Sequence, residues 1–439
     1  MNGARILGAV LAVSLVALLA AATQRPTGDA PRGAREELDA DEIGFMGNAG
    51  HVLDSKNPKL TAYFTQESYR PGDKARLIVT DDASRVDVQF FRAGGERVET
   101  VDRDVMCGSR ASSITHLGAV HGRLATLLHI GNWPSGVYFA RLSAPGGRIG
   151  YAPFVLAPRT LGEHRIAVVM PTQTWQAYNF RDDDGDGHPD TWYAGWKTNK
   201  ARLVRAFLNR GVPPHWKQYD APFVRWLVQT HRDVDYLSDA DLRAVRSGDE
   251  LAHSYTLIVF SGHHEYVTSH EYDVVVRYRD LGGNLAFLAA NNFFWKITIK
   301  NHVMARVAQW RDLGRPEAAL IGVQYRGNDE GRRRGPWIIR SGCSDAHWLL
   351  EHMRVTSGDG VGRGGIEIDS TSSASPKNVR VLAEIPNLFG PSFTAQMTYY
   401  ETREGARVFA AGAFSLAGSV WKPGVGALMT NLWERLGTN

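Results

Sequence analysis

Residues 255–290 read YTLIVFSGHHEYVTSHEYDVVVRYRDLGGNLAFLAA, and this stretch decides the fold of the region around it. It has a short apolar run at each end and an amphipathic segment between them. Thr268 followed by Glu271 forms a capping box, and Gly282 with Gly283 ends the segment, so we expect a helix between two strands. A strand-helix-strand unit predicts a parallel sheet.

Further apolar runs extend this pattern along the chain. RIAVVM at 165–170 precedes the unit, and ARVFAAG at 406–412 follows it. Runs that are apolar throughout are typical of strands buried on both faces of a parallel sheet. The second folded region, residues 159–439, is therefore expected to be an α/β domain with a mostly parallel sheet.

The preceding region has a different pattern. Residues 58–158 contain short alternating or β-branched runs separated by Gly, Pro and Asn, among them LTAYFT, ARLIVT, RVDVQFF and GVYFARL. Several short strands at this spacing predict an all-β sandwich domain. The polar, acidic residues 23–57 are expected to form a linker before it.

The N-terminus has the layout of an export signal. Residues 1–22 contain Arg5, an uninterrupted apolar run and small residues, and a polar segment follows. An uncleaved membrane anchor is the alternative, because the run is close to the length that spans a bilayer. Both interpretations predict a folded part outside the cytoplasm, either secreted, periplasmic or anchored by its N-terminus.

Charge and cysteine content narrow the classes further. The formal net charge is +4, and the basic run at 332–334 lies in a Gly-rich stretch, so no nucleic-acid partner is expected. Cys107 and Cys343 are the only cysteines in the sequence. They permit either one disulfide or two separate thiols, and both alternatives stay open.

Polar residues follow several of the expected strands. Tyr178 comes after RIAVVM, His263 and Glu265 come after YTLIVF, and Glu401 lies shortly before ARVFAAG. Ligands of an open parallel sheet bind beyond the carboxyl ends of its strands, so one cleft is expected for these side chains. The sequence has neither a HExxH zinc motif nor a GxSxG elbow, and it therefore favours chemistry by carboxylates and phenols with a nearby His.

Five stretches carry a resemblance to a known family: NWPSGVYFARL, PTQTWQAYN, IVFSGHHEYVT, LGGNLAFLAANNFFWK and YYETREGARVFAAGAF. From about residue 60 onward, the chain resembles the large (beta) subunit of N,N-dimethylformamidase and its relatives. The resemblance implies a β-sandwich followed by a glutamine-amidotransferase-like α/β domain. It also implies a mononuclear iron held by Tyr138, Tyr178 and Glu265, with His263 and Glu401 handling protons.

The chemistry of these side chains agrees with the implied iron. Phenolate and carboxylate are hard oxygen donors, which suit a ferric ion better than a soft metal. Iron would act as a Lewis acid on an amide carbonyl. Arg311 stands where the resemblance implies a Lys, and an Arg can clamp a carboxylate but cannot carry a proton.

A second metal site is indicated directly after Tyr178, in RDDDGDGHPD. Asp182, Asp184, Asp186 and Asp190 fit the ligand spacing of a calcium loop, although Tyr193 stands where such loops have Glu. A solvated acidic turn is the alternative interpretation.

Together these observations predict an exported, iron-dependent hydrolase acting on a C–N bond of a small amide. Zinc or manganese in the same ligands is an alternative, and a non-catalytic secreted protein that binds sugar or another ligand is the competing function. The aromatic residues that would line its cleft are Trp175, Trp192, Trp196, Phe293, Phe294 and Trp295. A homo-oligomer and a separate small subunit both stay open.

Overall fold

The computed structural model describes residues 59–96, 105–194, 198–340, 348–351, 353, 358–422 and 424–438. The predicted export signal at 1–22 and the linker at 23–57 lie outside these residues, as does Cys343. The signal and the disulfide alternative therefore stay predictions. Among the described residues, no helix combines the length and apolar composition needed to cross a membrane.

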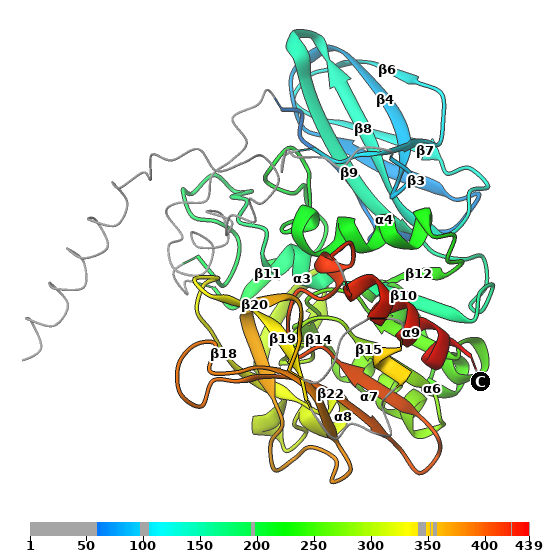
Figure 1. Cartoon of the computed structure of the whole chain (residues 1–439). Helices are drawn as coiled ribbons and strands as arrows, with labels where there is room; N and C mark the ends of the chain where they lie inside the picture. The colour runs from blue at the N-terminus through cyan, green and yellow to red at the C-terminus, as the bar shows by residue number, and fades with distance from the viewer. Residues whose placement is uncertain are drawn as a thin grey trace, which may run out of the picture. The chain divides into compact units, whose positions relative to one another are not determined.

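The N-terminal strands form the expected β-sandwich (Figure 1). One sheet has the order β1-β3-β7, and the other has the order β2-β9-β8-β4-β5 with β6 paired to β4. Neighbouring strands run antiparallel, except that β2 and β9 are parallel. The strands are β1 (Ala62–Phe64), β2 (Ser68–Tyr69), β3 (Lys74–Val79), β4 (Ala83–Ala93), β5 (Gly108–Arg110), β6 (Thr115–Val120), β7 (Leu124–His129), β8 (Gly136–Ala144) and β9 (Arg148–Leu156).

Alternation of side chains explains how this sandwich closes. Strand β4 buries Val86, Val88 and Phe90, which are every second residue of its central part. Aromatic rings fill the space between the sheets, and the ring centroids of Phe64 and Phe154 lie 5.1 Å apart in an edge-to-face arrangement. The polar residues between the buried ones face outward, as the sequence pattern predicted.

The second region contains a large mixed sheet. Its strands have the order β12-β10-β13-β15-β23-β22-β21-β19-β20-β18, with β24 paired to β20. The first five of these are parallel: β12 (Asp235–Ser238), β10 (Ile166–Met170), β13 (Leu257–Phe260), β15 (Asn284–Phe287) and β23 (Arg407–Ala410). The others run antiparallel: β22 (Ala395–Glu401), β21 (Arg380–Ile385), β19 (Arg334–Ile339), β20 (Gly360–Ser370), β18 (Gln324–Asn328) and β24 (Ala413–Phe414).

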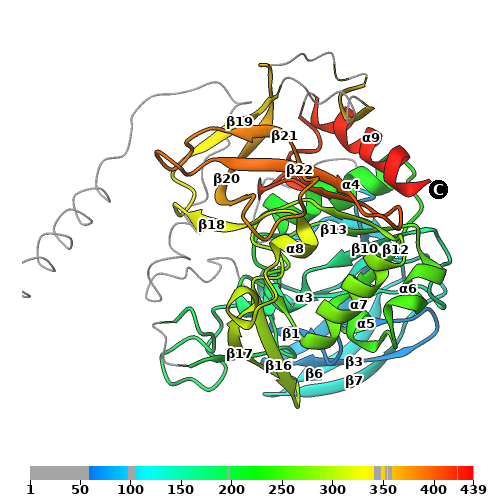
Figure 2. The same ribbon diagram turned by 90° about the horizontal axis from the view of Figure 1, so that it is seen from below.

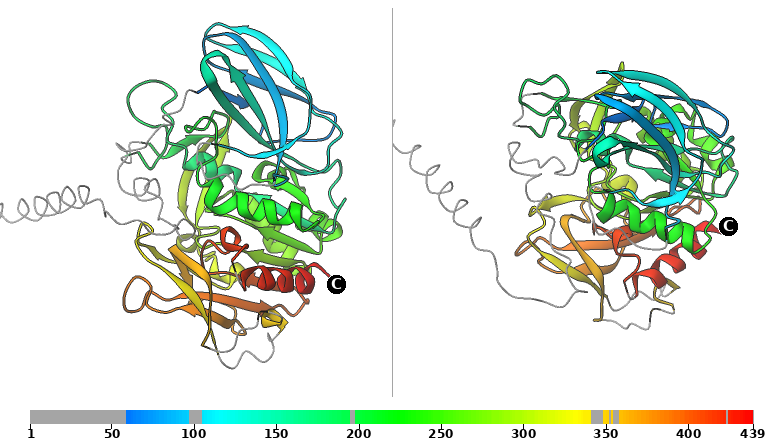
Figure 3. Two further views of the ribbon diagram at one scale, coloured as in Figure 1. Left: turned by 45° about the horizontal axis from the view of Figure 1, so that its top comes forward. Right: turned by 90° about the horizontal axis from the view of Figure 1, so that it is seen from above.

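The prediction of a mostly parallel sheet is therefore wrong for about half of this sheet. Strand β22 ends at Glu401 and β23 begins at Arg407. So short a connection forms a hairpin, because a parallel crossover needs about a dozen residues or more. The yellow and orange strands of Figure 3 are this antiparallel part.

Helices cover both faces of the parallel part (Figure 2). Leu257 and Val259 of β13 pack with α4 and α9, whereas Ile258 and Phe260 pack with α5, α6 and α7. Burial on both faces explains why this strand is apolar throughout. The helices are α3 (Thr172–Ala177), α4 (Ala221–Gln229), α5 (Asp239–Ala244), α6 (Gly248–Ser254), α7 (Ser269–Asp280), α8 (Ala318–Ile321) and α9 (Val425–Gly437), with 3-10 turns at Pro145–Gly147, Trp310–Leu313 and Ala417–Ser419 and a π-turn at Trp216–Asp220.

The predicted strand-helix-strand unit is confirmed as β13, α7 and β15. The Thr268 hydroxyl accepts a hydrogen bond from the Glu271 backbone at 3.3 Å, and the Glu271 carboxylate accepts one from the Thr268 backbone. Gly282, at φ 93°, adopts the left-handed conformation that ends the helix. A separate four-stranded sheet has the order β11-β17-β16-β14. Its strands are β11 (Lys200–Arg202), β17 (Val303–Gln309), β16 (Trp295–Lys300) and β14 (Tyr266–Val267).

Polar contacts join the sandwich to the mixed sheet. Glu67 accepts hydrogen bonds from Arg243 at 2.7 Å and from the Thr172 hydroxyl at 2.5 Å. Ser135 Oγ accepts one from the Tyr236 backbone at 2.8 Å. Thr172 is the first residue of α3, so these contacts also hold the helix that follows β10.

Candidate functional site at the ends of β10 and β13

The order of the parallel strands determines where a site can form. Strand β10 lies beside β13, but the chain continues from β10 to β12 on one side of this pair and from β13 to β15 on the other side. The loops after β10 and β13 diverge at such a switch point, and they leave room for a ligand. Tyr178 follows the first loop, and His263 and Glu265 lie in the second.

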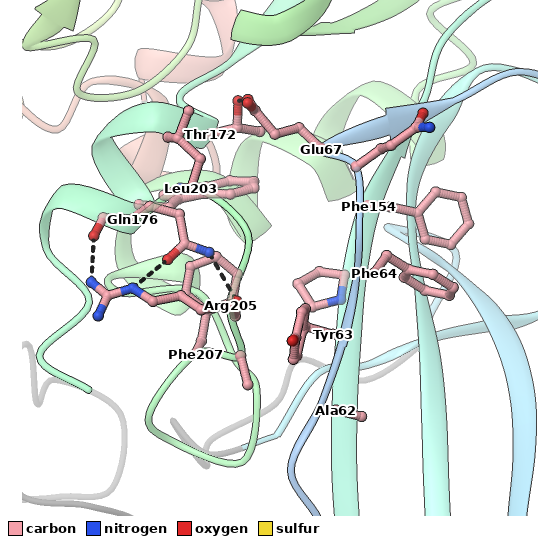
Figure 4. Close-up of a pocket in the computed structure, with 14 residues that line it drawn as sticks. Ala62, Tyr63, Phe64, Glu67, Phe154, Thr172, Gln176, Leu203, Arg205 and Phe207 are labelled. Atoms are coloured by element: carbon pink, nitrogen blue, oxygen red, sulfur yellow. Dashed lines mark hydrogen bonds between the residues drawn. The ribbon is translucent and has the colours of Figure 1, made fainter. Parts of the chain in front are cut away.

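A buried arginine fixes the helix that carries Tyr178. Arg205 donates hydrogen bonds to Gln176 Oε1 at 3.2 Å and to the Gln176 carbonyl at 3.1 Å. Gln176 Nε2 donates in return to the Arg205 carbonyl at 3.1 Å (Figure 4). These contacts fix the end of α3 to the segment that follows β11. Tyr178 is the first residue after α3, so the same contacts fix its position.

Three phenols converge on one buried carboxylate. The Tyr178 hydroxyl donates to Glu265 Oε2 at 2.7 Å, and the Tyr193 hydroxyl lies 3.0 Å from the same oxygen. Tyr193 also lies 2.8 Å from the Tyr178 hydroxyl and contacts the Tyr266 hydroxyl. We call Tyr178, Tyr193, Glu265 and Tyr266 the phenol cluster.

A histidine and a second carboxylate border the phenol cluster. His263 Nε2 lies 3.4 Å from Glu265 Oε2 and 3.6 Å from Glu367 Oε2. The three side chains are buried. Glu367 comes from β20, so the antiparallel half of the large sheet contributes to this site as well as the parallel half.

Burial dominates the electrostatics of these groups. It raises the pKa of Glu265 to about 7, although the three phenol hydroxyls and the charge of Arg306 favour the ionised form. Burial and the charge of Glu265 raise the pKa of Tyr178 well above its usual range. Burial, with smaller effects of His215 and His264, lowers the pKa of His263 well below its usual range.

The donor atoms of the phenol cluster fit a hard cation. A carboxylate and several phenols place their oxygens within hydrogen-bond distance of each other in a buried position. A bound cation would offset the cost of ionising these oxygens away from water, and it would lower the pKa of the phenols. Glu265 with Tyr178, Tyr193 and Tyr266 could therefore hold such an ion.

Tyr138 does not join this site. Its hydroxyl donates to the Pro134 carbonyl at 2.9 Å, and its ring stacks on Trp133 with centroids 5.3 Å apart. Burial raises its pKa to about 12. The residue lies in β8 at a position that points into the sandwich core, so it is a core aromatic and the phenol cluster forms without it.

Glu401 and Arg311 also lie away from the phenol cluster. Glu401 is exposed at the end of β22, where it accepts a hydrogen bond from the Tyr399 hydroxyl at 2.5 Å. Arg311 forms an ion pair with the buried Glu317 and donates to the Tyr325 carbonyl at 3.2 Å. The first is a surface group, and the second fixes the backbone at the start of β18.

The structure adds three residues that the sequence analysis did not assign to the site. Glu367 takes the place expected for Glu401, and Tyr266 directly follows Glu265 in the sequence. The sequence pattern places Tyr193 only at the last position of the predicted calcium loop. The position of Tyr266 directly after Glu265 could have indicated that it belongs to the site. Nothing in the sequence links Glu367 to the site, because β20 lies about a hundred residues further along the chain.

The acidic loop before Tyr193 folds into a compact turn. Asp182, Asp184 and Asp190 each place a carboxylate oxygen within 4.8 Å of the others, which is close enough to share a cation. Asp186 is not part of this group, and its carboxylate accepts a hydrogen bond from the His188 backbone at 2.7 Å. The predicted set of four is therefore reduced to three.

The proposed aromatic cleft does not form as one surface. Trp192 packs beside Tyr266 and Tyr178, whereas Phe293 lies in the core between the sheet and α7. Both side chains have 0% exposure. Trp196 lies outside the described residues.

The fold and site together define a class: a β-sandwich joined to an α/β sheet covered by helices on both faces, with phenols, carboxylates and an imidazole enclosed at the switch point. The profile of the family described as N,N-dimethylformamidase beta subunit-like, C-terminal, matches residues 125–424. The chain belongs to this family, as the sequence predicted.

Two curated relatives are N,N-dimethylformamidase beta subunits from Paracoccus aminophilus and from an Alcaligenes species. Each is 24% identical over 296 residues, which cover 54% of this chain and 38% of the relative. The matched region thus spans about two fifths of the relatives' length. Among solved structures, the mmIFT52 N-terminal domain has a TM-score of 0.29 at 12% identity, covering 48% of this chain and 87% of that one.

Proposed function

We propose that the chain is a metal-dependent hydrolase that cleaves the C–N bond of a small amide. Family membership supports an amide hydrolase, because the curated relatives are dimethylformamidase subunits. The observation that carries the proposal is the buried contact of 2.7 Å between the Tyr178 hydroxyl and Glu265, with His263 Nε2 3.4 Å from the same carboxylate oxygen. This geometry supports a cation site beside a proton carrier.

The proposed cation is iron(III), held by Glu265 and Tyr178 with Tyr193 or Tyr266 in place of Tyr138. Hard oxygen donors and ionised phenols suit this ion. When bound, it would supply Lewis-acid polarisation of the amide carbonyl. The phenol cluster comes from three segments, so the ion would also join the turn after α3, the loop before β11 and the start of β14.

His263 is the proposed proton carrier. Its neutral imidazole accepts a proton from water as the water oxygen bonds to the carbonyl carbon. The same proton then passes to the nitrogen as the C–N bond breaks, so that an acid and an amine leave. Glu367, 3.6 Å from Nε2, stabilises the imidazole while it carries the positive charge.

Metal content and colour test this proposal. Purified protein is expected to carry iron near one equivalent, to show the visible absorption of a ferric phenolate, and to release amine from formamides. Zinc or manganese without colour would support the alternative cations. Protein that binds amides but neither carries metal nor turns them over would support the competing ligand-binding function.

Further features belong to the same proposal. We propose export through residues 1–22, a glutamine-amidotransferase-like relationship for the α/β part, and a structural calcium at Asp182, Asp184 and Asp190. The parallel order β12-β10-β13-β15-β23 supports the second, and the spacing of the carboxylates supports the third. The curated relatives are named as beta subunits, which supports a further subunit as partner.

A further inference from the structure

A small cavity borders the phenol cluster. Its free volume is about 20 Å³. Its walls include Trp175, Tyr178, Tyr219, Asp220 and His263. A volume of this size holds about one water molecule or one group of similar size, such as an amide nitrogen.

Asp220 presents an oxygen without a partner at this cavity. The side chain is 1% exposed, and its Oδ2 accepts a hydrogen bond from Trp175 Nε1 at 2.9 Å. Within the described residues, Oδ1 has no hydrogen-bond partner. Buried carboxylate oxygens without a donor are unfavourable, so this atom needs a donor from outside the protein.

Asp220 lies where two helical segments join. Its backbone is helical, at φ −99° and ψ −47°, and its side chain makes no hydrogen bond to the first turn of α4. A π-turn, Trp216–Asp220, directly precedes the helix. Such turns are rare and frequently occur at functional sites.

The loop that carries His263 has a glycine, Gly262, where Asp220 Oδ1 approaches it. An added Cβ at Gly262 would lie 2.8 Å from Asp220 Oδ1 and 3.1 Å from the Pro171 ring. Glycine at this position therefore lets Asp220 approach the residue directly before His263. The unpartnered oxygen and the proposed proton carrier consequently face the same small space.

We propose that Asp220 Oδ1 accepts a hydrogen bond from an N–H of the substrate, so that this enzyme acts on amides that keep at least one N–H. The inference rests on the proposed function and specifies its substrate class. A primary or secondary amide supplies the missing donor. An N,N-dialkyl amide instead places a methyl group against a buried oxygen, which leaves that oxygen unpaired.

The test compares formamide and N-methylformamide with N,N-dimethylformamide, which share one acyl group. We expect kcat/KM of the native protein to be about tenfold or more higher for the amides with an N–H. Asp220→Asn replaces the acceptor by a donor while its carbonyl can still accept from Trp175. This variant is expected to raise KM for N–H amides and to bring the ratio close to one.

Asp235→Asn is the matched control. Asp235 is also buried, but its oxygens accept hydrogen bonds from Gly162, His164 and Tyr255. This variant should keep the native ratio. An equal or higher kcat/KM for N,N-dimethylformamide in the native protein, or an unchanged ratio in folded Asp220→Asn, would overturn the inference while leaving amide hydrolysis intact.

A binding measurement separates this inference from the proposed function. If no amide is hydrolysed, the proposed function fails, but saturation-transfer NMR still reports whether formamide binds more tightly than N,N-dimethylformamide. A preference for formamide that disappears in Asp220→Asn supports the inference that Asp220 accepts a hydrogen bond from the substrate N–H. Equal binding of the two amides to the native protein refutes it.

Discussion

At the scale of single residues, the assignment of ligands depends on which phenols reach Glu265. Tyr178 does so at 2.7 Å, whereas Tyr138 donates to Pro134 at 2.9 Å in the sandwich core. The family resemblance assigned both to one iron site, whereas the strand pattern alone placed only Tyr178 at the expected cleft. It could not show which way the Tyr138 side chain points, since that depends on the register between β8 and β9.

Paired substitutions distinguish the two tyrosines. Tyr178→Phe removes a proposed ligand, and we expect it to abolish the visible absorption and to lower kcat/KM by about a hundredfold or more. Tyr138→Phe removes a hydrogen bond worth about 1 kcal/mol and should lower only the melting temperature. Loss of the absorption in folded Tyr138→Phe would show that the ligand set is different from the one proposed.

At the scale of elements, the segments with strong local signals were predicted and the others were not. The capping box and the glycines predicted the two ends of α7, and the apolar runs predicted β10, β13, β15 and β23. Strands β18 to β22 were not predicted: β18, β19 and β20 contain glycines, and all five strands pair in antiparallel fashion. Glu367 lies in one of them, so the second carboxylate of the site could not be found from sequence.

The loop of residues 182–190 gives a second prediction at this scale. Calcium should raise the melting temperature of the protein, because the Asp182, Asp184 and Asp190 carboxylates repel each other without a cation. The same loop leads to Tyr193, so calcium should also increase activity at limiting iron.

Two neighbouring variants provide the control for this prediction. Asp184→Asn should weaken the calcium effect on melting temperature, whereas Asp186→Asn should change it little because Asp186 is outside the group. Equal losses in both variants, measured by differential scanning fluorimetry over a calcium titration, would favour a solvated turn.

At the scale of the whole molecule, the order of the strands brings distant residues together. The sandwich and the parallel strands were expected from sequence, but the mixed sheet and its order were not. Strand order depends on contacts between residues far apart in the chain, which local patterns do not encode. The position of β10 between β12 and β13 is what places Tyr178 beside Glu265.

Several buried carboxyl groups also give the molecule an unusual dependence of stability on pH. Burial raises the pKa to about 7 for each of Asp220, Glu265, Glu271 and Asp369. The folded state therefore keeps protons that the unfolded state loses above about pH 4 to 4.5. Their contribution to stability is fully present below that pH and is lost as pH rises through about 7.

We expect the metal-free protein to melt at a lower temperature at pH 8 than at pH 5.5. Each group changes the free energy of unfolding by at most about 1.4 kcal/mol per pH unit. Iron should reduce this slope, because a bound cation favours ionised Glu265. A melting temperature that rises over this range in chelator-treated protein would contradict the burial of these groups.

The most direct test of the central claim is the position of the metal. Crystals of the iron-loaded protein, measured on both sides of the iron absorption edge, should show one anomalous peak about 2 Å from oxygens of Glu265 and Tyr178. A peak beside Tyr138 or Glu401, or none near Glu265 in protein that hydrolyses amides, would contradict the account.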